Sequence, residues 1–154
     1  MLKEHLEPYL TMPAYFGLME KFVLRNGKMF PRGKRPRGVH LGKLGQCYRN
    51  AALLALAGYG EYVEGFAMKS GLIPLQHAWI EIDGEAIDNT WRDADGTEYM
   101  GVTFSDDVLR RELLKNKVYG ILEQRGRINR ALIASIDRQL IVDAETALQQ
   151  RVRA

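Results

Sequence analysis

The chain has 154 residues, 46% of them hydrophobic and 27% charged, which favours one globular domain with its own apolar core over a disordered or fibrous protein. Its single cysteine, Cys47, excludes an internal disulfide, and the first residues, MLKEHLEPYL, lack the apolar stretch of a signal peptide. No apolar run approaches the length of a membrane span. We therefore expect one domain over residues 1–154, cytoplasmic and without a membrane partner.

The net charge of +3 is unevenly distributed along the chain. Residues 21–60 contain nine basic side chains and no acidic one, and most of the nine lie between residues 25 and 43. Such a segment forms either a solvated loop or a surface for an acidic macromolecule, nucleic acid or protein. Its PRGKRPRG stretch lacks the aromatic residues on which bases stack.

The first sixty residues predict short helices, a loop and one apolar helix. Helical patterns within residues 2–24 are interrupted by prolines and a glycine, and Asn26-Gly27 then favours either a two-residue hairpin or the end of a helix. Residues 31–44 contain three glycines and two prolines and predict a loop. The helix expected from Cys47 to about Gly58 has Ala and Leu around most of its circumference, which predicts a buried, central position.

Three strands are predicted next, over residues 62–68, 75–82 and 85–91, and Asp83-Gly84 joins the last two as a two-residue type I′ hairpin. A polar loop follows.

The last fifty residues predict mainly helices. Ser105 is expected to cap a helix that ends near Lys115, and residues 117–122 predict a short strand. From residue 127 onward, the apolar residues recur at helical spacing, which indicates one long helix or two helices with a break near Val142.

Cys47 lies at the first turn of the predicted apolar helix. The partial positive charge and the free N–H groups of a helix N-terminus favour a thiolate there, and the same N–H groups can stabilise an oxyanion. A nucleophilic thiol also needs a base, and the chain offers three histidines, His5, His40 and His77.

The predicted hairpin singles out His77. A two-residue loop at Asp83-Gly84 places Trp79 opposite Asp88 and His77 opposite Thr90, and side-chain alternation puts all four on one face of the sheet. His77 and Asp88 are then diagonal neighbours within reach of a hydrogen bond. The sequence therefore predicts a triad with Cys47 as the nucleophile, His77 as the base and Asp88 as the residue that orients the imidazole.

Three short motifs in this region resemble those of the transglutaminase-like superfamily. Gly45-Gln46-Cys47-Tyr48 is similar to its Gly-Gln-Cys-aromatic motif, with Tyr48 in place of the usual tryptophan. His77-Ala78-Trp79 is similar to its His-x-Trp motif, and Asp88-Asn89-Thr90-Trp91 to its Asp-x-Thr motif, in the same order along the chain. The short spacing between the motifs resembles that of minimal microbial members, and the resemblance covers residues 45–91.

The resemblance implies an α+β fold with a papain-like core, in which a buried helix bearing the cysteine packs on a small antiparallel sheet. The predicted C-terminal helices would be additions to this core. It also implies a cysteine protease, amidase or acyltransferase that cleaves an amide or isopeptide bond of a protein or peptide through a thioester. If water accepts the acyl group, the protein would be a hydrolase, and if an amine accepts it, the protein would be a transferase. Both alternatives remain open.

Three residues near the motifs are candidates for oxyanion or substrate binding: Gln46, Tyr48 and Trp79. The Gln46 amide either donates to an oxyanion or only caps the helix, and Trp79 is expected to pack on the site. Glu64, on the first predicted strand, either contacts a substrate amine or faces solvent, and we expect it to face solvent.

No metal or organic cofactor is expected. Cys47 and His77 lack further ligands for zinc, and the acidic residues Asp93, Asp95 and Glu98 are too closely spaced for a calcium loop and predict a turn. The alternative to an enzyme is a binding module in which residues 25–43 contact an acidic partner and Cys47 is merely buried.

Overall fold

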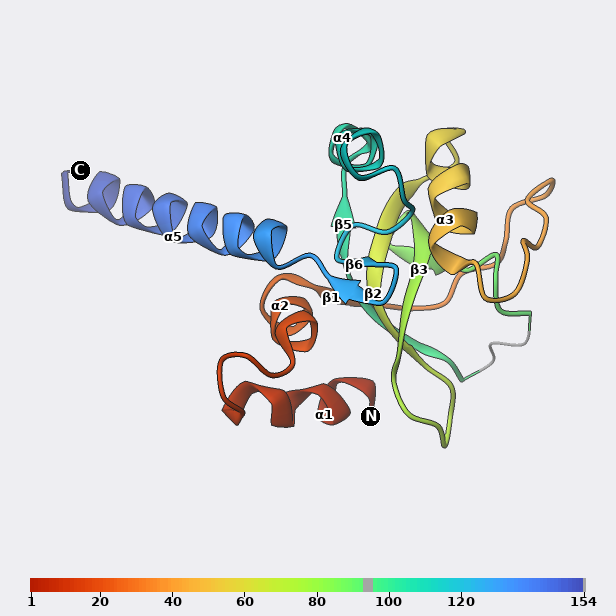
Figure 1. Cartoon of the computed structure of the whole chain (residues 1–154), viewed down its shortest axis with the longest axis horizontal. Coiled ribbons are helices and arrows are strands. Elements are labelled where there is room, and N and C mark those ends of the chain that lie inside the picture. Colours follow the sequence, from red (N-terminus) through yellow and green to blue (C-terminus); the bar gives the residue numbers. More distant parts are fainter. Residues whose placement is uncertain (93–95, 154) are drawn as a thin grey trace.

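A computed structural model describes residues 1–92 and 96–153 and shows helices arranged around a curled antiparallel sheet (Figure 1). The predicted α+β class is confirmed. The turn predicted at Asp93 and Asp95 lies outside the described residues. No helix in the described part of the chain combines the length and the apolar character that crossing a bilayer requires.

The sheet has the strand order β1-β5-β2-β3-β4, and every neighbouring pair is antiparallel. Its strands are β1 (Lys28–Phe30), β2 (Glu61–Met68), β3 (Leu75–Ile82), β4 (Glu85–Ile87) and β5 (Glu98–Phe104). A separate hairpin consists of β6 (Glu123–Gln124) and β7 (Arg127–Ile128). The sequence prediction lacks β5, which lies between β1 and β2, and it is wrong in assigning a strand to residues 117–122.

The helices are α1 (Leu2–Leu6), the 3-10 helix η1 (Glu7–Thr11), α2 (Leu18–Asn26), α3 (Cys47–Leu56), α4 (Asp106–Asn116) and α5 (Arg130–Arg153). Gly27 ends α2 through a hydrogen bond from its N–H to the Val23 carbonyl, so Asn26-Gly27 ends a helix and does not form a hairpin. Ser105 caps α4 as predicted, because its hydroxyl accepts a hydrogen bond from the Val108 N–H at 3.3 Å.

Helix α3 covers one face of the sheet along β3 and β2. Its small residues Ala51, Ala52 and Ala55 are fully buried and allow the helix to lie close to Ala78 and Ile80. The prediction that α3 is buried all round is wrong for its outer side, where Leu53 is 41% exposed. The helix is therefore a layer on the sheet, with its N-terminal end left open.

The opposite face of the sheet holds a smaller apolar cluster around Trp79. Gly65 pairs with Gly101 in the neighbouring strand and with His77 on the other side. A Cβ atom on Gly101 would lie only 2.8 Å from the Trp79 ring. Gly101 thus leaves the room that the aromatic ring beside His77 occupies.

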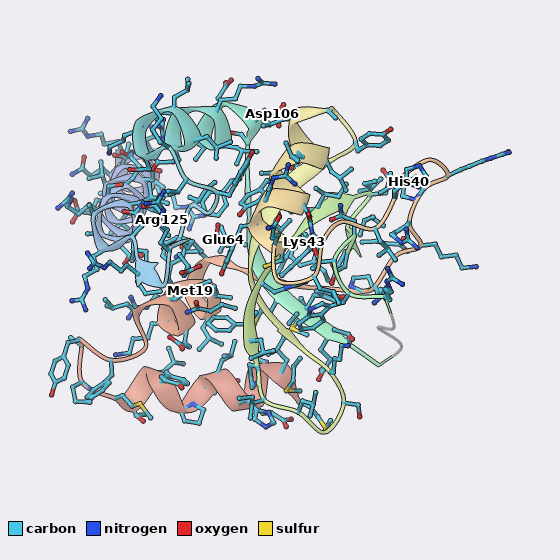
Figure 2. All side chains as sticks on the ribbon, turned by 45° about the vertical axis from the view of Figure 1, so that its right-hand side comes forward. Met19, His40, Lys43, Glu64, Asp106 and Arg125 are labelled. Carbon is cyan, nitrogen blue, oxygen red and sulfur yellow. The ribbon has the colours of Figure 1, made fainter. Side chains whose placement is uncertain are left out.

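Glu64 is buried on the α3 side of the sheet, and the prediction that it faces solvent is wrong. Its carboxylate accepts hydrogen bonds from the Tyr62 hydroxyl at 2.9 Å and from the backbone N–H groups of residues 121, 122 and 123 at 2.7, 2.9 and 2.7 Å. Figure 2 shows Glu64 in the interior of the fold, with Lys43 on one side and Arg125 on the other in that view. Because these N–H groups are bound to a side chain, the segment before β6 forms a loop instead of the predicted strand.

Burial makes the Glu64 charge costly. It raises the pKa of the carboxyl to about 7, although the four hydrogen bonds favour the charged form.

Helix α5 is continuous and packs on the core only through its first turns. Leu132, Ile133 and Ile136 contact the apolar core, whereas Val142 and Leu148 are exposed where the helix projects away from the domain (Figure 1). The side chains of Leu140 and Ala144, which belong to the predicted apolar spacing, lie outside the described part.

Replacing Glu64 with glutamine should lower the free energy of unfolding by about 2–4 kcal/mol, because the amide nitrogen would face buried backbone donors that then lack an acceptor. Denaturant unfolding followed by tryptophan fluorescence measures the change. Glu61→Gln, at the exposed start of the same strand, is the matched control and should change the free energy by less than about 0.5 kcal/mol. Equal stability of the two variants at about pH 5, where the difference should be largest, would contradict the role assigned to Glu64.

The difference in stability between the unsubstituted protein and Glu64→Gln should depend on pH. The folded pKa of about 7 lies above the usual value of 4.5, so the folded state binds a proton more tightly than the unfolded state does. The stability contributed by the protonated carboxyl is complete below the unfolded pKa and is lost as the pH rises through the folded one. The advantage of the unsubstituted protein over Glu64→Gln should therefore shrink between about pH 5 and pH 8.

Candidate active site

Cys47 is the first residue of α3 and is half-buried at the open end of the helix. The first N–H groups of a helix have no partner within it and point toward whatever lies beyond its end. Gln46 occupies the N-cap position, but its side chain makes no capping hydrogen bond. Of the two roles considered for the Gln46 amide, capping is therefore not observed.

The β3–β4 hairpin has the predicted two-residue loop. Ile82 pairs with Glu85, and both Asp83 and Gly84 have the positive φ of a type I′ turn, at 51° and 82°. The imidazole Nε2 of His77 lies 2.8 Å from Oδ2 of Asp88, as the register predicts.

Asp88 also ends β4, which is shorter than predicted. Its Oδ1 accepts hydrogen bonds from the backbone N–H groups of Thr90 at 2.8 Å and Trp91 at 3.2 Å. An aspartate that binds the backbone two residues ahead forms a turn and draws the chain away from the neighbouring strand. The predicted strand is therefore wrong beyond Ile87, and the pairing of Thr90 with His77 does not form.

The segment that leaves the sheet is held against the start of α3 instead. The Asn50 amide donates to the Thr90 hydroxyl at 3.0 Å and to the Lys43 carbonyl at 2.9 Å, and the Gly42 N–H donates to the Asn89 carbonyl at 2.7 Å. Asn50 lies one turn after Cys47 on α3. These contacts fix the helix end that carries the thiol relative to the segment that begins with Asp88.

His77 connects the thiol to the carboxylate. It is 2% exposed, and the Trp91 ring stacks on it with 4.2 Å between ring centroids. Asp88 binds Nε2 of the imidazole, and Cys47 lies close enough to His77 to act on its pKa. Burial by itself would lower the pKa of His77, but the hydrogen bonds and negative charges of Asp88 and Cys47 raise it to about 9.

Tyr99 is a second partner of Asp88 that the sequence analysis missed. Its hydroxyl donates to Oδ2 at 2.9 Å, and the Arg32 guanidinium donates to the same hydroxyl at 3.4 Å. Burial opposes the Asp88 charge, but the hydrogen bond and charge of His77 and the two backbone donors hold the pKa of Asp88 below its usual range. The carboxylate is thus bound on both oxygens and fixed in orientation.

The three residues predicted to bind an oxyanion or substrate occupy different places. Gln46 and Tyr48 line an open cavity beside the start of α3, together with Glu123. Trp79 is fully buried behind His77, with its ring 5.1 Å from that of Tyr99. Its indole N–H has no hydrogen-bond partner among the described residues.

The basic segment is not one free surface. Arg25 pairs with Asp137 at 3.9 Å and Lys28 with Glu81 at 2.7 Å, while Arg32 supports Tyr99 behind the site. Lys34 and Arg37 are exposed. The solvated-loop interpretation therefore fits the middle of the segment but not Arg32.

Comparison of the chain with protein-family models, with curated proteins and with solved structures gives no match in any of the three.

The geometry predicts how the imidazole titrates. Asp88→Asn should lower the pKa of His77 from about 9 to below its usual 6.5, because burial would then act without the neighbouring carboxylate. NMR of the carbon-bound imidazole protons across the pH range measures this. Asp83→Asn removes an exposed carboxylate at a turn position where asparagine is favoured, and it should leave the titration unchanged. A pKa at or below 6.5 for His77 in the unsubstituted protein would contradict the assignment.

Proposed function

We propose that the protein is a cysteine-dependent hydrolase or acyltransferase that cleaves an amide or isopeptide bond of a protein or peptide, with the papain-like core of a transglutaminase-like enzyme. The observation that carries this proposal is the buried imidazole of His77, which is hydrogen-bonded to Asp88 and has Cys47 as a second neighbour that raises its pKa. A histidine buried only for packing needs neither a thiol nor a carboxylate, whereas acyl transfer needs both in this order.

The first half of the reaction follows from the protonation state of His77. With a pKa of about 9, the imidazole is protonated at neutral pH. A cationic imidazole stabilises a neighbouring thiolate, and the thiolate of Cys47 is the nucleophile in the proposed reaction. The sulfur attacks the substrate carbonyl carbon, an S–C bond forms, and the carbonyl electron pair moves to oxygen. The N–H groups at the start of α3, with the Gln46 amide, are the donors for this oxyanion. His77 gives its proton to the leaving nitrogen, the C–N bond breaks, and a thioester on Cys47 remains.

The second half regenerates the thiolate. His77 removes a proton from the acceptor, which attacks the thioester carbonyl, and the S–C bond breaks. Water as the acceptor gives an acid and an amine gives a new amide. Asp88, held by Tyr99 and two backbone N–H groups, keeps the imidazole in one orientation throughout and stabilises its charged form.

A small activated ester tests the proposal without knowledge of the natural substrate. The protein should be acetylated on Cys47 by p-nitrophenyl acetate and should release p-nitrophenolate repeatedly, with the adduct detected by intact-mass spectrometry. Cys47→Ala should abolish the adduct, and His77→Ala should slow turnover about a hundredfold or more, because general acid–base catalysis is lost. The double variant should be no worse than either single one, since the residues act as a unit.

Stability controls separate chemistry from folding. Cys47→Ala should change the free energy of unfolding by only about 1 kcal/mol, because a small half-buried side chain is removed. Asp83→Asn should retain full turnover. Adding methylamine identifies the acceptor, because a transferase should form N-methylacetamide faster than the Cys47→Ala variant does. A folded protein in which Cys47 is never acetylated would sink the proposal and favour the binding module.

A further inference from the structure

A cavity of about 480 Å³ opens beside the start of α3, and the proposed mechanism assigns no ligand to it. Three segments that are distant in sequence form its wall: the first turn of α3, the end of α4 and the β6–β7 hairpin. They contribute Gln46, Tyr48, Arg49, Lys117, Glu123 and Arg125. Gln46 and Tyr48 are the two chain neighbours of Cys47, so the cavity opens beside the residue proposed as the nucleophile, which does not itself line it.

The charges in this cavity are unbalanced. Arg49, Lys117 and Arg125 are exposed in its wall, and in the described part of the chain none of them lies within ion-pair distance of an acid. The one carboxylate in the wall, Glu123, is buried and accepts a hydrogen bond from the Gly126 N–H. Three cations are thus left facing an open space.

Two of these cationic residues have a left-handed backbone conformation, which is unfavourable for lysine and arginine. Lys117 at the end of α4 has φ 57°, and Arg125 in the β6–β7 loop has φ 52°. Glycine or asparagine is the usual choice at such places, and the left-handed conformation costs other residues about 1 kcal/mol or more. Only three non-glycine residues in the described chain have positive φ, and two of them line this cavity. At the end of α4 a cation is favoured by the helix dipole, which accounts in part for Lys117, but no such local feature explains Arg125.

The wall between these two residues is fixed. Glu64 holds the N–H groups of residues 121–123 through its carboxylate, and the Gly126 N–H is bound to Glu123. Lys117 and Arg125 therefore project from a loop and a hairpin whose backbones are held in place. A site held in this way loses little conformational freedom when it binds a ligand.

We propose that this cavity binds a carboxylate of the substrate, so that the enzyme acts on acidic peptides with a glutamate or aspartate beside the bond to be cleaved. Arg49 and Arg125 offer the paired donors that suit a carboxylate, and Lys117 adds a point charge. The inference rests on the proposed function, because it defines the site relative to Cys47.

Two reagents of equal size test the inference. N-chloroacetyl-glutamic acid α-amide and N-chloroacetyl-glutamine α-amide both alkylate thiols and differ only in one carboxylate. The rate constant for labelling Cys47, measured by intact mass at neutral pH and low salt, should be about tenfold higher for the glutamate reagent. The double variant Lys117→Asn with Arg125→Asn should bring the ratio close to one.

Asparagine fits the backbone at both sites, so the double variant should be as stable as the unsubstituted protein or more so. The matched control is Arg138→Gln with Arg151→Gln, which removes two exposed charges from α5 and should leave the ratio unchanged. Lower preference together with undiminished stability is the result expected of residues kept for their charge.

The failures can be told apart. A ratio near one in the unsubstituted protein, with Cys47 labelled by both reagents, overturns the carboxylate site and leaves the nucleophile intact. An equal loss of preference in the α5 control shows that only net charge matters and also overturns it. If Cys47 in the folded protein resists both reagents and iodoacetamide, the proposed function fails, and the carboxylate site fails with it.

Discussion

The carboxylate of Glu64 accepts hydrogen bonds from three consecutive backbone N–H groups and thereby fixes the loop before β6 against the centre of β2. No strand or helix satisfies these donors, so without Glu64 they would be buried and unpaired. Burial opposes the negative charge of the Glu64 carboxylate and raises its pKa to about 7. The hairpin with Arg125 follows directly on this loop and depends on its position. The position of the cavity wall beside Cys47 therefore depends on one residue of β2, Glu64.

Asp88 has a comparable double function on the other side of the sheet. One oxygen binds His77 and Tyr99, and the other binds the backbone N–H groups of Thr90 and Trp91. The backbone contacts end β4 and direct the chain toward α3, where Asn50 receives it. The same carboxylate that orients the imidazole thus also brings the helix end with the thiol to it. Removing Asp88 would disturb both the charge and the path of the chain.

The parts of the site that the sequence predicts are local ones. Asp83-Gly84 allows only one register for the hairpin, and that register brings His77 to Asp88 without any knowledge of the rest of the fold. The sequence does not predict the role of Tyr99, because this residue reaches Asp88 from β5. That strand pairs with β2, about thirty residues earlier in the chain, and no local pattern encodes such a pairing. Glu64 had a visible signal that was misjudged: Tyr62 and Phe66 share its face of the strand and both are apolar, so that face is buried.

The two buried carboxylates show opposite pKa shifts although both accept several hydrogen bonds. For Asp88 the cost of burial is outweighed by the hydrogen bond and charge of His77 together with two backbone donors. Glu64 has only neutral donors, and burial prevails. Below about pH 8, His77 and Asp88 keep their charges, while Glu64 takes up a proton as the pH falls through 7. A change in behaviour near pH 7 would therefore originate in the cavity wall and not in the proton-transfer residues, even though the two lie at the same end of α3.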